Sequence, residues 1–196
     1  MTAPVVTALR GRGAGRVAVE LDTRPWRVLP IEAVVCAGLT VGDGLDRPRA
    51  RALRRELRRF EARETALQAL RTRDHTRASL DRRLAERGTS ASVRHETIAA
   101  VARAGLVDDG RFAAGRASSL AARGAGNALI EDDLALRGVP ADLIRGAVSG
   151  LEPEWDRAER ILAARGRSLR TARYLAAKGF AAETVEGIVA DLVGEV

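Results

Sequence analysis

The order of apolar and polar positions divides the chain into a short strand region and a long helical region. Apolar residues alternate with others over residues 17–21, and a turn-type tetrapeptide at 22–25 separates this run from another at 26–29. Alternation with a period of two on both sides of a turn predicts a β-hairpin. From Pro48 onward, apolar residues recur at spacings of three, four and seven, which predicts helices. The pattern therefore predicts a mainly α fold with a small β element near the N-terminus.

Changes in this pattern divide the chain into five segments. Residues 1–16 are rich in glycine and small side chains and show no period, so we expect a disordered tail. Residues 17–46 are expected to form a subdomain of the β-hairpin and a short helix, residues 31–37, that ends at Gly38. The remaining segments are three predicted helical repeats, at 47–107, 108–151 and 152–196.

The repeats are recognised by similar residues around Gly88, Gly138 and Gly179. Four residues before each glycine stands a leucine, ten residues after it stands Ile or Val, and a basic residue directly precedes it. The unit this predicts is a helix, a short turn, a second helix, a glycine stop and a third helix. Repeats of this size stack on their neighbours, so we expect an elongated, curved helical array. Such arrays typically bind other macromolecules.

Positive charge is concentrated in one segment of the chain. The formal net charge is +7, yet residues 47–83 alone carry thirteen Arg against five acidic residues. The segments on either side are close to neutral, and residues 152–196 are slightly acidic. A local excess of this kind is typical of a surface that meets a polyanion or an acidic protein.

The predicted helix in this basic segment presents arginines at helical spacing on its polar side. Like charges at that spacing weaken an isolated helix slightly, which favours an anionic partner. All but one of the 33 basic residues are Arg, however, so an ordinary solvated face is an equal alternative. The candidate residues for partner or DNA binding are Arg51, Arg54, Arg55, Arg58, Arg59 and Arg63.

The remaining composition argues against several classes of protein. A single cysteine, Cys36, excludes an internal disulfide framework and a Cys-based zinc site, and we expect it to be a buried apolar residue. From the sequence we expect no nucleophile to be arranged for catalysis beside either of the two histidines. No apolar stretch is long enough to span a membrane, and the N-terminus carries no secretory signal, so we expect a cytoplasmic protein. We expect no catalytic residues, no metal and no cofactor.

At residues 105–113 the sequence resembles a known family. The run Gly105-Leu106-Val107-Asp108-Asp109-Gly110-Arg111-Phe112-Ala113 is similar to the signature of RecX proteins. The order of the three repeats, the N-terminal hairpin and the loop that begins at Gly38 resemble the same family, so the similarity covers about residues 17–194. The second repeat departs from it, because acidic residues stand at 131–133 where the family usually carries basic ones.

The resemblance implies a regulator of the RecA recombinase. Members of the family bind RecA, lodge in the groove of its filament on single-stranded DNA, and inhibit its ATPase, strand-exchange and co-protease activities. They modulate recombinational DNA repair and the SOS response, contact DNA weakly, and are not enzymes. By this resemblance the partners are the RecA filament and, weakly or through the filament, single-stranded DNA.

The acidic pair within the signature has a structural interpretation from the residues alone. Asp108 and Asp109 precede a predicted helix, where carboxylates accept hydrogen bonds from free backbone N–H groups. We expect Arg111 to pair with a carboxylate and Phe112 to pack in the core. The signature residues Gly105, Leu106, Asp108, Asp109, Arg111 and Phe112 are therefore predicted to be mostly structural.

Other functions remain open at this point. An independent DNA-binding protein with helix-turn-helix-like repeats is the main alternative, although one basic segment rather than one in each repeat argues against it. A scaffold without any effect on DNA is a further possibility. For the regulator we expect a monomer that docks across neighbouring protomers of the filament.

Overall fold

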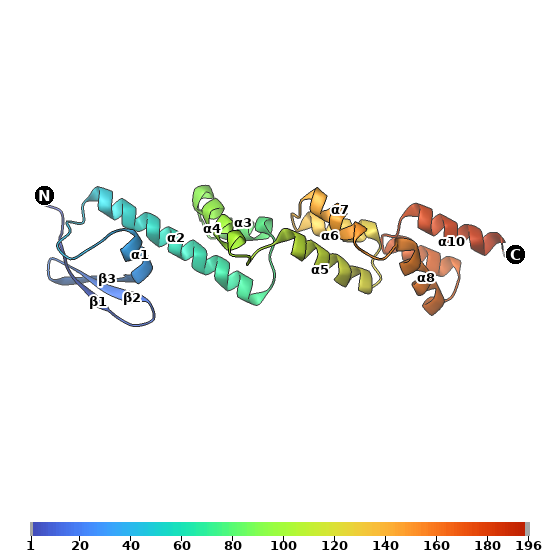
Figure 1. Ribbon diagram of the computed structural model, residues 1–196, viewed down its shortest axis with the longest axis horizontal. Coiled ribbons are helices and arrows are strands. Elements are labelled where there is room, and N and C mark those ends of the chain that lie inside the picture. The colour runs from blue at the N-terminus through green and yellow to red at the C-terminus, as the bar shows by residue number, and fades with distance from the viewer. Residues whose placement is uncertain (1, 195–196) are drawn as a thin grey trace. The chain divides into compact units, whose positions relative to one another are not determined.

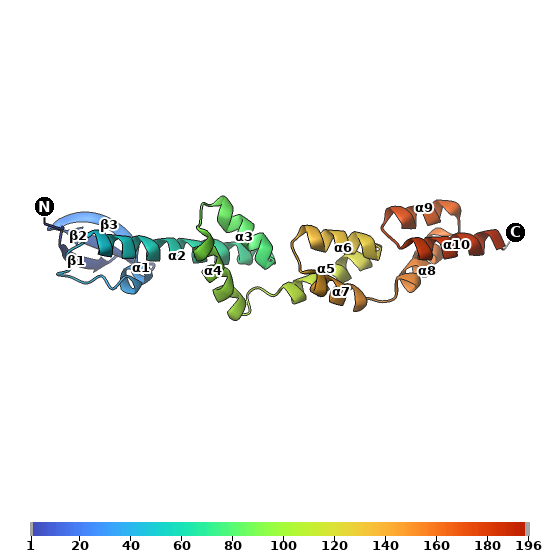
Figure 2. The same cartoon turned by 90° about the horizontal axis from the view of Figure 1, so that it is seen from above.

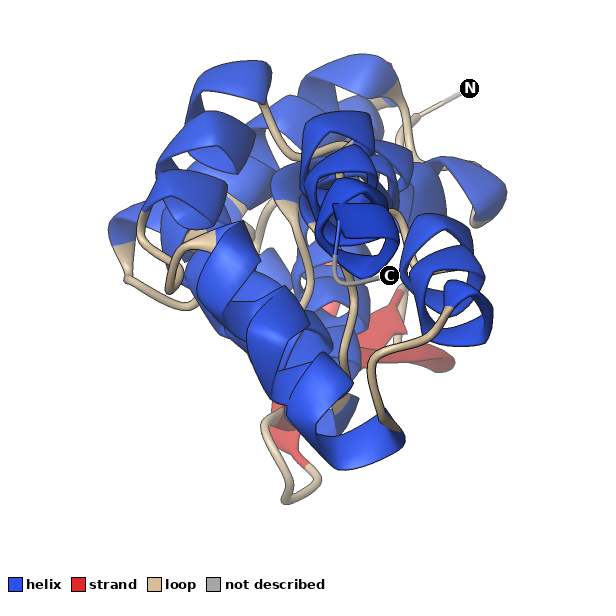
Figure 3. Ribbon diagram, turned by 90° about the vertical axis from the view of Figure 1, so that its right-hand side faces the viewer, coloured by secondary structure: helices blue, strands red, loops and turns tan. Residues whose placement is uncertain are grey.

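The computed structural model describes residues 2–194, with side chains through residue 190. Within that range it contains ten helices and a single three-stranded sheet (Figures 1 and 3). This confirms the predicted fold class, a mainly helical protein with a small β element at the N-terminal end. Two compact units are present, the first formed by residues 1–72 and 81–101 and the second by 73–80 and 102–196.

The sheet of the first unit is antiparallel and has the order β1-β2-β3. Its strands are β1 (Val6–Gly11), β2 (Arg16–Leu21) and β3 (Arg24–Pro30). The predicted hairpin is confirmed, and its two-residue turn places Asp22 and Thr23 at φ values of 48° and 65°. Positive φ at both positions gives a turn whose twist matches that of the flanking strands. Pro25 lies in the edge strand β3, where a missing N–H costs least.

The prediction of a disordered tail at residues 1–16 was wrong for the strand β1. Val6 is fully buried, and β1 pairs with β2 along most of its length. The strand is also held from its other side, because the amide of Val6 donates to the backbone carbonyl of Asp43 at 2.8 Å and the amide of Leu45 donates to the backbone carbonyl of Pro4 at 2.7 Å. These partners lie far along the chain, so no local period marks the strand. Residues 1, 195 and 196 lie outside the described range.

Helices α1 (Ile31–Cys36) and α2 (Arg47–Thr72) cover the sheet of the first unit. The core comprises Val6, Val17, Val19, Leu29, Val34, Leu39 and Leu53. Gly38 follows α1 at φ 64°, which confirms it as the helix stop. Asp46 accepts from the amide of Arg49 at 2.9 Å at the start of α2. Cys36 is exposed, contrary to expectation, because it lies at the end of a one-and-a-half-turn helix that buries Ala33 and Val34 instead.

The second unit contains two complete three-helix groups. The first comprises α5 (Asp109–Ala122), α6 (Asn127–Leu136) and α7 (Ala141–Ser149), and the second comprises α8 (Glu154–Arg165), α9 (Leu169–Ala177) and α10 (Ala182–Gly194) (Figures 1 and 2). Each group has its own apolar core, centred on Ile130 and Leu134 in the first and on Leu162 and Leu175 in the second. The remaining helices are α3 (Arg77–Glu86) and α4 (Ala91–Arg103).

The glycines that anchor the repeats have the backbone conformation expected of helix stops. Gly88, Gly138 and Gly179 all have φ between 73° and 79°, a region that favours glycine. Two of them also allow close approach. A methyl group at Gly138 would lie 2.4 Å from Cβ of Ala78, and one at Gly179 would lie 2.6 Å from the backbone nitrogen of Leu129. The boundaries of the other four predicted segments, residues 17–46, 47–107, 108–151 and 152–196, stay a prediction.

Candidate functional site

The candidate surface is the arginine face of α2, which we define as Arg51, Arg54, Arg55 and Arg58. Spacings of three and four residues place these side chains on one side of the helix, and all four are exposed. They line a common shallow depression on the surface. Among the described residues, none of the four forms an ion pair. The face therefore presents four guanidinium groups whose hydrogen-bond donors are available to a partner.

The other two predicted site residues are engaged within the first unit. Arg59 donates to Glu96 on α4 at 3.0 Å and to Glu56 at 2.7 Å. The hydrogen bond with Glu96, and then that with Glu56, raises the pKa of the Arg59 guanidinium. Arg63 pairs with Glu32 on α1 at 2.5 Å. The structure thus brings together four of the six predicted arginines as a free surface and places two in contacts between helices.

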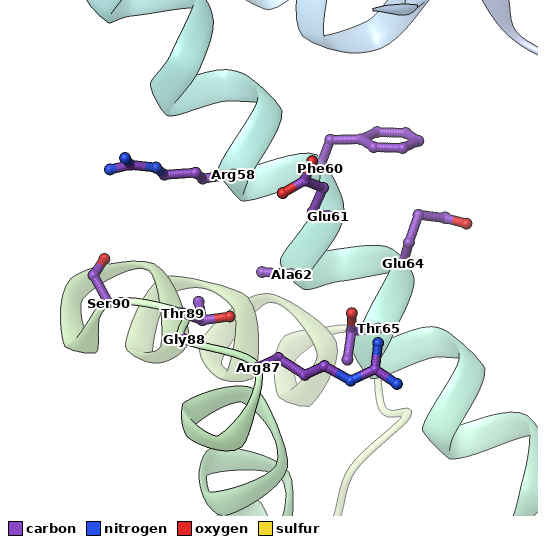
Figure 4. A pocket seen from close by; sticks show the side chains of 10 residues that line it. All are labelled: Arg58, Phe60, Glu61, Ala62, Glu64, Thr65, Arg87, Gly88, Thr89 and Ser90. Carbon is purple, nitrogen blue, oxygen red and sulfur yellow. The ribbon is translucent and has the colours of Figure 1, made fainter.

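A groove adjoins this face where α2 lies beside the turn between α3 and α4. Its walls are Arg58, Ala62 and Thr65 on α2 and Arg87, Thr89 and Ser90 in the turn (Figure 4). In Figure 4, Arg58 extends from α2 and Arg87 extends from the turn on the other wall of the groove, and their guanidinium groups point in opposite directions. Arg87 was noticed in the sequence only as the residue before Gly88, because its proximity to α2 depends on tertiary structure.

Chemically, this arrangement is suited to binding an extended anion. Guanidinium groups form paired, charge-assisted hydrogen bonds with phosphates and carboxylates. The acidic residues Glu61 and Glu64 also line the groove, so its charge is mixed, whereas the arginine face itself is purely cationic. Within the described part of the chain, no group of three or more His, Cys, Asp or Glu side chains is placed to hold a metal ion.

The acidic pair of residues 108 and 109 serves two different helices. Asp108 accepts from the amide of Arg111 at 2.9 Å and is the N-cap of α5, as predicted, and this hydrogen bond lowers the pKa of its carboxyl group. Asp109 is buried and accepts instead from the amide of Arg77 at 2.9 Å, at the first residue of α3. The second carboxylate therefore connects α5 to the helix that precedes it by one repeat.

The same connection recurs one repeat later. Glu154, the first residue of α8, accepts from the amide of Asn127 at 2.5 Å, and Asn127 is the first residue of α6. The residue before each of these first residues also forms a hydrogen bond to the neighbouring repeat. The hydroxyl of Thr76 donates to the carbonyl of Arg137 at 2.7 Å, and the amide of Gly126 donates to the carbonyl of Lys178 at 2.8 Å. Neighbouring repeats of the second unit are thus joined by one repeated set of hydrogen bonds.

The remaining signature residues have mainly structural positions. Gly105 adopts φ 70° just beyond α4, and Leu106 is exposed. Phe112 is half-buried and packs against the core of α5–α7, which confirms that it contributes to the core. Arg111 was expected to pair with a carboxylate, but its side chain donates to the carbonyl of Gly105 at 3.2 Å.

The fold and this surface define the class to which the protein belongs: it is a helical-repeat protein with an exposed basic face. No family model matches the chain. Over 138 residues it is 36% identical to the regulatory protein RecX of Halorhodospira halophila, and the aligned region covers 65% of this chain and 86% of that protein. It is 31% identical over 153 residues to the regulatory protein RecX of Mycobacterium leprae, and this aligned region covers 70% of this chain and 90% of that protein.

Solved structures show the same fold. The crystal structure of a regulatory protein RecX superposes with a TM-score of 0.78 at 18% identity, covering 94% of this chain and 98% of that one. The RecX structure from Lactobacillus salivarius gives a TM-score of 0.60 and covers 69% of this chain. By the sequence relationship, the chain belongs to the RecX family of regulatory proteins. Within residues 2–194, no helix combines the length and apolar character needed to cross a membrane.

Proposed function

We propose that this protein regulates the RecA recombinase by binding its filament on single-stranded DNA. Bound there, it inhibits ATP hydrolysis, strand exchange and co-protease activity, and so modulates recombinational repair and the SOS response in the cytoplasm. It acts as a monomer, by binding rather than by catalysis. Membership of the RecX family supports the class of partner, and the arginine face of α2 supports the mode of contact.

The observation that carries the proposal is the set of four exposed guanidinium groups on one helix that form no ion pair with any side chain the structure describes. Such a face meets phosphate groups of the filament's DNA or carboxylates of the filament's protein surface. A mixed or fully paired surface would offer an anionic partner little net attraction, because its carboxylates offset the field of its guanidinium groups. The face therefore distinguishes α2 from the helices whose arginines are already engaged.

The proposal is tested by DNA-dependent ATP hydrolysis of RecA from the same organism. The protein is added at ratios from far below to above one molecule per RecA protomer. We expect hydrolysis to fall well before equimolar ratios are reached, since one bound molecule affects several neighbouring protomers. Unchanged hydrolysis at every ratio contradicts the proposal.

The second candidate function, an independent DNA-binding protein, predicts a different result. The same arginine face would bind bare DNA, and that binding would weaken steeply with salt and need no recombinase. Unchanged RecA hydrolysis together with salt-sensitive binding to bare DNA would favour this function.

A further inference from the structure

A second group of free arginines lies in the second unit, far along the sequence from α2. Arg165 at the end of α8 and Arg170 and Arg173 on α9 line one cavity together with Ser168, Thr171 and Tyr174. The three guanidinium groups are exposed, and none of them is in an ion pair with another described residue. The slight negative charge of residues 152–196 hides this cluster in any count along the sequence.

The ring of Tyr174 holds one of these arginines in place. The guanidinium carbon of Arg165 lies 4.0 Å from the ring centroid, and the ammonium group of Lys178 lies 5.6 Å from it. A guanidinium stacked on an aromatic ring keeps its N–H groups free along its edge. The stacking therefore orients Arg165 and reduces the conformational entropy that it loses on binding, without using its hydrogen-bond donors.

Neighbouring polar groups are already occupied, which separates the structural contacts from the free ones. The hydroxyl of Thr171 donates to the carbonyl of Gly166 at 2.8 Å, and Ser168 accepts from the amide of Thr171 at 3.2 Å. Arg167 pairs with Glu159 at 2.7 Å. These contacts fix the turn between α8 and α9, and they leave the side chains of Arg165, Arg170 and Arg173 as the donors that face a ligand.

We propose that this cluster is a binding site for phosphate groups, and that its ligand is the backbone of single-stranded nucleic acid. Three guanidinium groups around one cavity match the several acceptor oxygens of a phosphate. Because all three are exposed to water, each contact is weak alone, and a polymer gains from several contacts at once. Free phosphate has the same chemistry but lacks that advantage.

Weak contact with single-stranded DNA is already implied by the family resemblance, and the inference is the place of that contact on the chain. The test contains no recombinase, so its outcome does not depend on the proposed regulation of RecA. Binding of a fluorescently labelled oligothymidylate is measured by anisotropy over a range of salt concentrations. The variant Arg165→Glu/Arg170→Glu/Arg173→Glu is compared with Arg83→Glu/Arg103→Glu/Arg145→Glu. The control makes the same change in net charge at exposed arginines of α3, α4 and α7 that pair with no acidic side chain among residues 2–190. Circular dichroism checks that both variants fold.

We expect the cluster variant to bind at least about fivefold more weakly than the control variant. Its salt slope should fall by about two, because each phosphate contact to a single strand contributes about 0.7. Tyr174→Phe should keep the wild-type affinity, since the ring remains, whereas Tyr174→Leu should lose part of it. Equal affinities and slopes for the two triple variants would overturn the site.

Inorganic phosphate distinguishes the two sources of the ligand. At constant ionic strength, replacing chloride with millimolar phosphate should displace little of the bound oligonucleotide. Strong displacement, or binding of phosphate without binding of the oligonucleotide, overturns the polymer as the ligand. If RecA hydrolysis is unaffected while this site binds the oligonucleotide, the proposed function fails and the site remains.

Discussion

At the scale of single residues, two adjacent carboxylates show how position along a helix decides what a side chain holds. Asp108 caps its own helix, whereas Asp109, one residue further, reaches the first amide of α3. The carboxylate of Asp109 accepts from the amide of Arg77, which is at the start of α3 and has no partner within its own helix. Asp109 therefore stabilises the junction between α3 and α5.

Replacing Asp109 by alanine should destabilise the fold by about 1–2 kcal/mol, because the amide of Arg77 loses its acceptor in a buried place. The midpoint of urea denaturation measures this. Asp142→Ala is the matched control, since Asp142 is exposed in the first turn of α7 and makes no capping hydrogen bond there. A midpoint for Asp109→Ala that equals that of the control would contradict the assigned role.

Asp133 on α6 explains why an acidic residue stands in the second repeat where basic ones are usual. It accepts from Arg116 on α5, at 2.8 and 2.9 Å, and from Arg137 at 2.8 and 3.2 Å. Hydrogen bonds from Arg116, and then from Arg137, hold the pKa of the Asp133 carboxyl well below its usual range. The acidic residue here ties two helices of one repeat together.

The depressed pKa predicts a pH dependence of stability. The contribution of Asp133 is fully present above its unfolded-state pKa of about 4, and it is lost progressively as the pH falls toward the lower pKa of the folded state. Asp133→Asn should therefore cost about 1–2 kcal/mol at pH 7. The gap between the two proteins should narrow below about pH 4. A gap in denaturation midpoint that stays constant from pH 7 to pH 3 would refute this role.

At the scale of elements, the anchoring glycines separate two requirements that look alike in the sequence. Gly88 and Gly179 both have positive φ, but a methyl group would meet open space at Gly88 and the backbone of Leu129 at Gly179. Gly88 is needed for conformation alone, whereas Gly179 is also needed for the close approach of α9 to α6.

Substitution by alanine at these two positions should therefore give unequal losses. Gly88→Ala should cost about 1 kcal/mol for the left-handed conformation. Gly179→Ala should cost about 2 kcal/mol more, because the backbone of one helix must move away from the other. Thermal denaturation of the two variants gives the comparison, and similar melting temperatures would show that the close approach carries no cost.

The sequence predicted those elements whose signals are local. The hairpin, the glycine stops and the cap at Asp108 depend on neighbours within a few residues, and all were found. Strand β1 was missed because its partners lie in β2 and in the loop at residues 42–45. After Leu53, the most buried positions of α2 are the small residues Ala62, Ala66 and Ala69.

The sequence predicted which helix carries the candidate site, but it did not predict which of its arginines are free. Helical spacing placed the arginines on α2, but it could not show that Arg59 and Arg63 are held by Glu96 and Glu32, which are distant in sequence. The cluster at Arg165, Arg170 and Arg173 was not predicted, because acidic residues nearby in the sequence cancel its charge in any count along the chain. In the structure two of those acidic residues, Glu152 and Glu159, pair with other arginines.

At the scale of the whole molecule, the chain has free basic surfaces in both units, although its net charge arises in one segment. Each surface consists of arginines that the fold leaves unpaired, while other arginines nearby hold helices together. The arginine face of α2 is the surface on which the proposed regulation of RecA depends. Neutralising the free arginines should therefore weaken partner binding, whereas neutralising the paired arginines should lower the stability of the fold.

The most direct measurement is the RecA ATPase titration with an altered arginine face. Arg51→Glu/Arg54→Glu/Arg58→Glu is compared with the control variant Arg83→Glu/Arg103→Glu/Arg145→Glu, which changes the net charge equally. We predict that the first variant needs at least about tenfold more protein for half-maximal inhibition, while the control stays within about threefold of wild type, because only the first loses contacts of about 1–3 kcal/mol with the filament. Undiminished inhibition by the first variant would contradict the account.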